Sequence, residues 1–272
     1  EQAMKRPCLV IVLLALAIPA GWAETAFIAE FTGGNDLVSA DLVAQTQDIV
    51  LPGRGWIMDI AVDPGADKLY WIESPMEVMR SNLDGSELEV VVGGFSFAPG
   101  SSGIALDLSA GKTYWNDMDF IWRANLDGSN IEMVNGPWQV TLTGGIDIDV
   151  AAGKVYYSGI PQATPIDPIY RANLNGSGIE VVWDHPTMLV GSLALDNLNS
   201  MIYFADTRGS GIHRVDKNGN NLTLIHPSAD VCGVAVDPAG GTVYWADGSS
   251  RSVWRAELDG ANPTRVLYTS PA

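Results

Sequence analysis

The chain has 272 residues, of which 15 are basic and 32 are acidic, so its formal net charge at pH 7 is −17. A surface this acidic repels nucleic acid and anionic lipid headgroups, which excludes nucleic-acid-binding proteins and proteins held electrostatically on membranes. The length is sufficient for one large all-β domain or for two smaller domains, each with its own hydrophobic core.

The first residues have the features of a secretory signal peptide. Lys5 and Arg6 form a basic cluster, an apolar run follows over residues 9–20, and small residues stand at positions 21 and 23. The run is too short to span a bilayer, and no later stretch is long and apolar enough to be a membrane helix. We therefore expect residues 1–23 to be cleaved and residues 24–272 to be secreted or periplasmic.

One pattern then recurs five times along the chain. Each copy opens with a short apolar run that ends in an aspartate, and a tyrosine follows seven residues later. The aspartates are Asp63, Asp107, Asp149, Asp196 and Asp237, and the tyrosines are Tyr70, Tyr114, Tyr156, Tyr203 and Tyr244. Each tyrosine begins a second short run. A third run carries Arg80, Arg123, Arg171, Arg214 or Arg255, and a fourth apolar run completes the copy.

The spacing of the copies predicts a six-bladed β-propeller. Their turn glycines, from Gly85 to Gly260, are 43, 48, 43 and 41 residues apart, and four short β-strands at such a period are typical of propeller blades. Residues 27–51 match the second, third and fourth strands of a further copy, so we expect six blades in one domain over residues 24–272. The first blade lacks its inner strand, and the chain stops at Ala272, where the next inner strand would begin. We expect either a three-stranded first blade or a truncated chain.

The repeated residues resemble those of a known family. Tyr244-Trp245-Ala246-Asp247, the preceding Val234-Ala235-Val236-Asp237 and the turn Asn125-Leu126-Asp127-Gly128 resemble the YWTD repeats, also called low-density lipoprotein receptor class B repeats. The resemblance covers residues 26–268. It implies a six-bladed propeller that binds other proteins.

Residues found in every copy are expected to be structural, because a single functional site cannot have five equivalents. We predict that the repeated aspartates and arginines make turn hydrogen bonds, inter-blade hydrogen bonds or buried ion pairs. Functional residues are sought where the copies differ.

The loops on one face of the ring differ most. If each inner strand runs from the top of the ring to the bottom, the loops between blades and those between second and third strands share the top face. The aromatic and methionine side chains in these loops are candidate contacts for a protein or peptide ligand, since such side chains dominate interface energetics; a plug over the channel mouth is the alternative. They are Trp56, Phe95, Phe97, Trp138 and Met188.

Acids and histidines near the same face are further candidates. Asp147 stands where the other copies have alanine, and together with Asp59 and Asp230 it would offer oxygen ligands to calcium or bind a basic ligand group. Asp147 is alternatively an acid satisfied by its neighbours. His185 and His226 each precede a proline after the fourth strand, at positions that we interpret as corresponding; they would make ligand binding pH-sensitive, or have no role.

The sequence contains no Gly-x-Ser-x-Gly, His-Glu-x-x-His or Cys-x-x-Cys motif. We therefore expect a secreted, monomeric, non-catalytic binding module without a cofactor, whose top face engages a protein or peptide. The alternative is a calcium-dependent lactonase or lyase with its site at the channel mouth, so enzymatic activity stays open.

Overall fold

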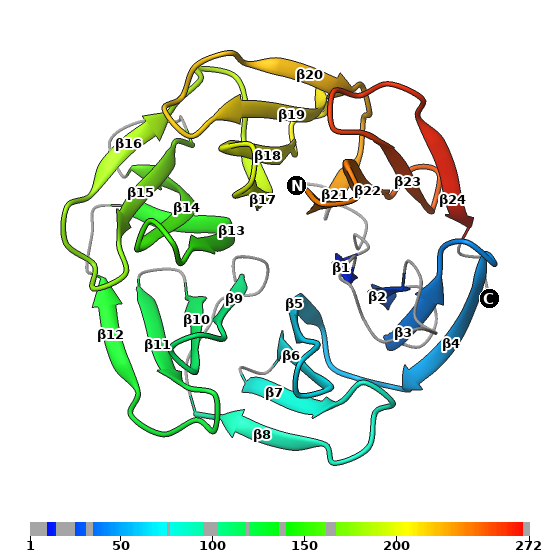
Figure 1. The fold of residues 1–272 in the computed structure, drawn as a ribbon, viewed down its shortest axis with the longest axis vertical. Helices are drawn as coiled ribbons and strands as arrows, with labels where there is room; N and C mark the ends of the chain where they lie inside the picture. The colour runs from blue at the N-terminus through cyan, green and yellow to red at the C-terminus, as the bar shows by residue number, and fades with distance from the viewer. Residues whose placement is uncertain are drawn as a thin grey trace, which may run out of the picture.

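The computed structural model describes residues 10–14, 25–30, 35–74, 77–94, 103–117, 120–135, 140–161 and 167–268. These residues form 24 strands in six four-stranded antiparallel sheets, which are arranged as blades around a central axis (Figure 1). The first strand of each sheet lies nearest the axis and the fourth lies at the rim. The described part of the chain contains no helix that could cross a bilayer. The predicted all-β, six-bladed propeller is confirmed.

The strands follow the repeat from the inside of each blade to the outside. Blade 1 contains β1 (Val10–Leu14), β2 (Thr25–Glu30), β3 (Asp36–Asp41) and β4 (Thr46–Leu51). Blade 2 contains β5 (Ile57–Asp63), β6 (Lys68–Glu73), β7 (Glu77–Asn82) and β8 (Glu89–Val92). Blade 3 contains β9 (Ile104–Asp107), β10 (Lys112–Asn116), β11 (Ile121–Asn125) and β12 (Glu132–Asn135).

The second half of the ring repeats the same order. Blade 4 contains β13 (Val140–Asp149), β14 (Lys154–Pro161), β15 (Ile169–Asn173) and β16 (Glu180–Trp183). Blade 5 contains β17 (Val190–Asp196), β18 (Met201–Asp206), β19 (Gly211–Asp216) and β20 (Thr223–His226). Blade 6 contains β21 (Val231–Asp237), β22 (Thr242–Asp247), β23 (Ser252–Glu257) and β24 (Thr264–Tyr268).

Blade 1 takes its inner strand from an unexpected part of the chain. As predicted, the residues after position 23 supply only β2, β3 and β4 to this blade. The inner position is occupied by β1, which lies in the segment predicted as a signal peptide and pairs antiparallel with β2, from Val10 opposite Ala29 to Leu14 opposite Thr25. Cleavage after residue 23 stays a prediction, and it would remove this strand from the ring.

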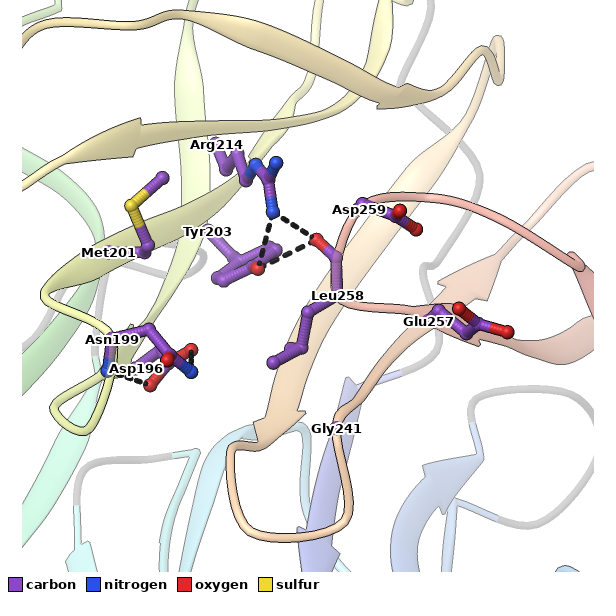
Figure 2. Close-up of a pocket in the computed structure, with 9 residues that line it drawn as sticks. All are labelled: Asp196, Asn199, Met201, Tyr203, Arg214, Gly241, Glu257, Leu258 and Asp259. Atoms are coloured by element: carbon purple, nitrogen blue, oxygen red, sulfur yellow. Dashed lines mark hydrogen bonds between the residues drawn. The ribbon is translucent and has the colours of Figure 1, made fainter.

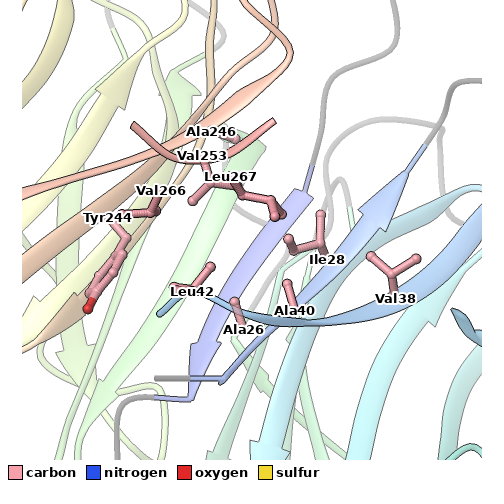
Figure 3. Packing of buried hydrophobic residues seen from close by; sticks show 10 residues of the cluster. All are labelled: Ala26, Ile28, Val38, Ala40, Leu42, Tyr244, Ala246, Val253, Val266 and Leu267. Carbon is pink, nitrogen blue, oxygen red and sulfur yellow. The ribbon is translucent and has the colours of Figure 1, made fainter. Parts of the chain in front are cut away.

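Apolar contacts between blades form the core. The indole rings of Trp71, Trp115 and Trp245, at equivalent places in three second strands, are completely buried. A cluster shared by blades 1 and 6 joins the two ends of the ring (Figure 3). Its members are Ala26, Ile28, Val38, Ala40, Leu42, Tyr244, Ala246, Val253, Val266 and Leu267. The ring is therefore closed by side-chain packing between its first and last blades.

The repeated polar residues have the predicted structural roles. Each of the five repeated aspartates accepts a hydrogen bond from the backbone N–H three residues later, at 2.8 to 3.1 Å, which fixes the turn after the inner strand. Nη1 of four repeated arginines donates to a turn carbonyl in the next blade, at 2.6 to 3.2 Å. The donor and acceptor pairs are Arg80 with Leu126, Arg123 with Leu174, Arg171 with Lys217, and Arg214 with Leu258.

Blades 4 and 5 share an additional ionic contact. Lys217 stands where the equivalent turns have leucine, and its Nζ lies 2.5 Å from Oδ2 of Asp149 and also bonds to Asn197. Both partners are mostly buried. A buried ion pair of this kind fits the prediction that the repeated aspartates link neighbouring blades.

Proline substitutions in β1 test whether residues 10–14 complete the ring. Backbone N–H groups of neighbouring residues in an antiparallel strand point to opposite sides, so either Ile11 or Val12 must donate to β2. We expect at least one of Ile11→Pro and Val12→Pro to lower the thermal unfolding midpoint of the full chain by about 5 °C or more. The alanine variants at both positions control for loss of the side chain. Unchanged midpoints in both proline variants would show that β1 does not hold the inner position in solution.

Candidate functional site

The top face carries the predicted contact residues that the structure describes. Trp56 immediately precedes β5 in the loop from blade 1 to blade 2, and its side chain is 47% exposed. His185 and Met188 lie in the loop from blade 4 to blade 5, and Asp230 lies in the loop from blade 5 to blade 6. Phe95, Phe97 and Trp138 lie outside the described residues.

Backbone contacts hold the loop that presents Trp56. The Trp56 carbonyl accepts a hydrogen bond from the Ser74 N–H at 2.9 Å, and the Arg54 N–H donates to the Asn35 carbonyl at 2.7 Å. A side chain at Gly55 would overlap the Ser74 carbonyl oxygen, so only glycine fits this close approach of the two loops. Trp56 is thus exposed on a loop whose backbone is fixed.

The buried carboxylate of Glu73 supports the loop that carries Trp56. Glu73 accepts hydrogen bonds from the Trp71 Nε1–H at 2.8 Å and from the Arg54 Nε–H at 3.0 Å, and its other oxygen contacts Arg54 Nη2. The Arg54 guanidinium lies 6.0 Å from the centre of the Trp71 ring, within cation–π range. The sequence interpretation missed both Arg54 and Glu73. The sequence did carry one sign of this contact, because Glu73 stands where the repeat has aspartate.

Asp206 and Asp247, the last residues of β18 and β22, hold two other loops of the top face. Asp206 Oδ1 accepts from the Leu189 N–H at 2.9 Å and from the Arg208 N–H at 3.0 Å, which ties the loop carrying His185 and Met188 to blade 5. Asp247 accepts from Ser228 Oγ at 2.7 Å and from the Ser250 N–H at 2.8 Å. In blades 5 and 6, the aspartate at the end of the second strand therefore anchors a loop of the top face.

The two candidate histidines are not equivalent. His226 is the last residue of β20 and pairs with Ile212, just as Trp183 pairs with Ile169 in blade 4. His226 therefore corresponds to Trp183, and the interpretation that it corresponds to His185 was wrong. The equivalence of His226 and Trp183 follows from the register of the third and fourth strands, which a following proline does not fix.

Their surroundings differ accordingly. The His226 ring packs on Trp245 and Trp254, with centroids 4.9 and 5.9 Å away, and burial lowers the pKa of this histidine. His226 therefore belongs to the packing between blades 5 and 6. His185 stacks on Trp183 with centroids 5.9 Å apart and keeps part of its surface exposed on the top face.

Asp59 and Asp147 link neighbouring inner strands. Asp59 accepts from the Ile60 and Ile104 N–H groups, both at 2.9 Å, and so joins β5 to β9. Asp147 accepts from the Ile148 N–H at 2.7 Å and the Leu195 N–H at 2.8 Å, and so joins β13 to β17. The alternative that Asp147 is satisfied by its neighbours therefore agrees with its hydrogen bonds. Among the described residues, no three His, Cys, Asp or Glu side chains gather as a metal site, so Asp59, Asp147 and Asp230 do not form one together.

Burial raises the pKa of both linking carboxyls. The pKa of Asp59 rises from 3.8 to about 7, because burial, with a contribution from the nearby Asp147 charge, outweighs the two backbone hydrogen bonds. The pKa of Asp147 rises from 3.8 to about 6 for the same principal reason. Both acids therefore take up protons in the folded protein at a pH where the unfolded chain releases them.

An Asp59→Asn variant tests this assignment through the pH dependence of stability. With the folded pKa above the unfolded value, the stability that protonation contributes is present below about pH 4 and is lost as pH rises towards 7. We expect Asp59→Asn to reduce the stability difference between pH 5 and pH 8 by roughly 1 to 3 kcal/mol, measured by urea unfolding. Asp147→Asn is the matched variant, and its effect should be confined to lower pH, below about 6. Parallel pH profiles for the wild type and Asp59→Asn would contradict the assignment.

A groove that the sequence interpretation did not anticipate lies on the opposite face. It is open, has a volume of about 480 Å³ and lies between blades 5 and 6, beside the turns after β17, β21 and β23 (Figure 2). Its lining residues are Asp196, Asn199, Met201, Tyr203, Arg214, Gly241, Glu257, Leu258 and Asp259. Because its two walls come from different copies of the repeat, no single copy reveals it.

Comparisons with known proteins agree with the repeat pattern. No family model matches the chain. Over 61 residues the chain is 46% identical to the human low-density lipoprotein receptor-related protein 5-like protein. That match covers 21% of this chain and 23% of the human protein, so the similarity spans less than a quarter of the relative. This match and the six-bladed fold support the resemblance of the chain to YWTD-type β-propellers.

Solved structures share its fold over most of its length. The protein is similar to a chain in the crystal structure of a nidogen/laminin complex, with a TM-score of 0.73, 18% identity, and 90% of this chain and 93% of that chain covered. It is also similar to a putative TolB from Agrobacterium tumefaciens, with a TM-score of 0.67, 18% identity, and coverage of 84% and 86%. TolB from Acinetobacter baumannii gives a TM-score of 0.66 at 15% identity, with coverage of 96% and 67%. At these identities the similarity establishes the fold alone.

Proposed function

We propose that this protein is an exported, non-catalytic binding module whose top face engages a protein or peptide partner. The observation that carries the proposal is the exposed indole of Trp56 on a loop fixed by Ser74, Asn35 and the Arg54–Glu73 pair. Tryptophan is enriched among the residues that contribute most to protein interfaces. A loop whose backbone is already held loses little backbone conformational entropy on binding, which favours affinity.

The relatives support the same class of function. One of the similar structures is a complex of two proteins, nidogen and laminin, and the human relative is named after a lipoprotein receptor-related protein. Export is supported by the basic cluster and apolar run of residues 1–23. We propose that the protein acts as a monomer. We also propose that binding needs no metal, because Asp59 and Asp147 already use their carboxylate oxygens to bind backbone N–H groups.

A Trp56→Ala variant tests the proposed binding surface. The full chain is biotinylated and used to capture proteins from the extracellular or periplasmic fraction of its source, and the captured proteins are quantified by mass spectrometry. We expect Trp56→Ala to reduce the capture of the specific partner by about tenfold or more, since loss of a central aromatic contact costs about 2 kcal/mol or more.

Leu198→Ala is the matched control. Leu198 is a 72% exposed apolar residue in the turn after β17, on the face opposite to Trp56. It should leave capture unchanged, and both variants should keep the unfolding midpoint of the wild type because neither side chain is buried. Equal recovery of every captured protein by the wild type and Trp56→Ala would refute the proposed surface.

A further inference from the structure

Blades 2 to 6 carry the same exposed turn between their third and fourth strands. In each of these turns a glycine donates its backbone N–H to the carbonyl three residues earlier, at 2.8 to 2.9 Å. The residue before that glycine is exposed, and it is an aspartate in three blades and an asparagine in two. The pairs are Asp84-Gly85, Asp127-Gly128, Asn175-Gly176, Asn218-Gly219 and Asp259-Gly260.

An asparagine before a glycine is chemically labile. The backbone nitrogen of the glycine attacks the side-chain carbonyl carbon of the asparagine, because no β-carbon hinders its approach. Asparagine is accordingly counted among the thermolabile residues of proteins. The amide group must first turn towards the glycine nitrogen, so hydrogen bonds that hold the amide slow the reaction. A third such pair, Asn135-Gly136, includes a glycine outside the described residues.

The turn of blade 4 holds its asparagine. Oδ1 of Asn175 accepts hydrogen bonds from the Ser177 N–H at 3.1 Å and from the Ser177 hydroxyl at 2.7 Å. The aspartates of blades 2, 3 and 6 accept the same backbone hydrogen bond at 2.9 Å. In these four turns, the side chain that precedes the glycine is therefore fixed.

The turn of blade 5 is built differently and leaves its asparagine unheld. Asp216, the first residue of this turn, accepts hydrogen bonds from the Asn218 and Asn220 N–H groups at 2.8 and 3.1 Å. Asn220 stands at the place of Ser177, so Asp216 accepts the bond that the residue before glycine accepts in the other turns. The exposed side chain of Asn218 makes no hydrogen bond with any described residue. Its amide is free to turn towards Gly219.

We propose that Asn218 is a site of spontaneous deamidation. The Gly219 nitrogen attacks Cγ of Asn218, the new C–N bond closes a succinimide ring, and the side-chain amide leaves as ammonia with the glycine proton. Water then opens the ring. Cleavage of the new C–N bond gives aspartate, and cleavage of the original peptide C–N bond gives isoaspartate, whose backbone runs through the former side chain. The site lies on the face opposite to Trp56 and does not depend on the proposed function.

The two products differ in their effect on the contact between blades 4 and 5. Aspartate fits this turn, because blades 2, 3 and 6 have aspartate at the equivalent place. Isoaspartate lengthens the backbone between two residues that contact blade 4. Lys217 Nζ lies 2.5 Å from Asp149 Oδ2, and Gly219 lies so close to the Val182 carbonyl oxygen that a β-carbon would overlap it. A longer backbone between Lys217 and Gly219 displaces one of these contacts.

Peptide mapping of the incubated full chain tests the site. The folded protein is kept at mildly alkaline pH in high salt, which screens the repulsion between Asp216 and the negatively charged reaction intermediate. Mass spectrometry follows the replacement of the amide by a carboxyl group at Asn175 and Asn218 separately. We expect Asn218 to react about fivefold faster or more than Asn175, because only Asn175 must break side-chain hydrogen bonds. In urea, which unfolds both turns, the two rates should be similar. Equal rates in the folded protein would overturn the proposal.

A Ser177→Ala variant tests whether the side-chain contacts cause the difference. It removes one of the two hydrogen bonds that hold Asn175 and leaves the turn of blade 5 unchanged. We expect deamidation of Asn175 to become about twofold faster or more, while the rate at Asn218 stays that of the wild type. An unchanged rate at Asn175 would reject the side-chain contacts as the cause.

Thermal unfolding tests the effect on the contact between blades 4 and 5. Asn218→Asp reproduces the aspartate product and should keep the unfolding midpoint within about 1 °C of the wild type. The isoaspartate form, separated from the incubated protein by ion-exchange chromatography, should unfold about 2 °C lower or more. Equal midpoints of these two proteins would show that the longer backbone leaves the contact intact.

Discussion

Every blade of this ring depends on the next one to cover its apolar face. A four-stranded sheet with large aromatic side chains such as Trp71, Trp115 and Trp245 is unstable alone, because those rings are buried only when a neighbouring blade lies against them. The arginine Nη1 contacts add direction to this non-directional packing, since each one joins a fixed atom in one blade to a fixed carbonyl in the next. Repetition of this contact from each blade to the next produces the ring and its two faces.

The same repetition separates structural residues from functional ones. An aspartate that anchors a top loop, such as Asp206 or Asp247, is required by the scaffold, and so its presence says nothing about a ligand. The informative positions are those where one blade departs from the others. Glu73, for example, replaces an aspartate and reaches Trp71 and Arg54. This departure adds a contact and stiffens a loop.

The sequence predicted the strands that carry the repeat and the roles of its aspartates and arginines, because these follow from local spacing. It did not predict that Val10–Leu14 would pair with β2, because those residues lack the inner-strand motif and have the composition of a signal peptide. The equivalence of His226 and Trp183 depends on strand register, which a nearby proline does not determine. The Arg54–Glu73 pair and the groove between blades 5 and 6 join residues of different elements, and one-dimensional repeats carry no signal for such contacts.

The position of β1 also bears on how the ring forms. This strand contacts both β5 and β21 across the inside of the ring, yet it comes near the start of the chain and β21 near its end. In a chain that keeps residues 1–23, a strand made early during synthesis therefore waits for almost the whole polypeptide before its last neighbour arrives. Contacts between such distant residues slow folding, since the entropy of closing a long loop is lost before the contact forms. Blades 2 to 5 are free of this delay, because each finds its partner in the next stretch of chain.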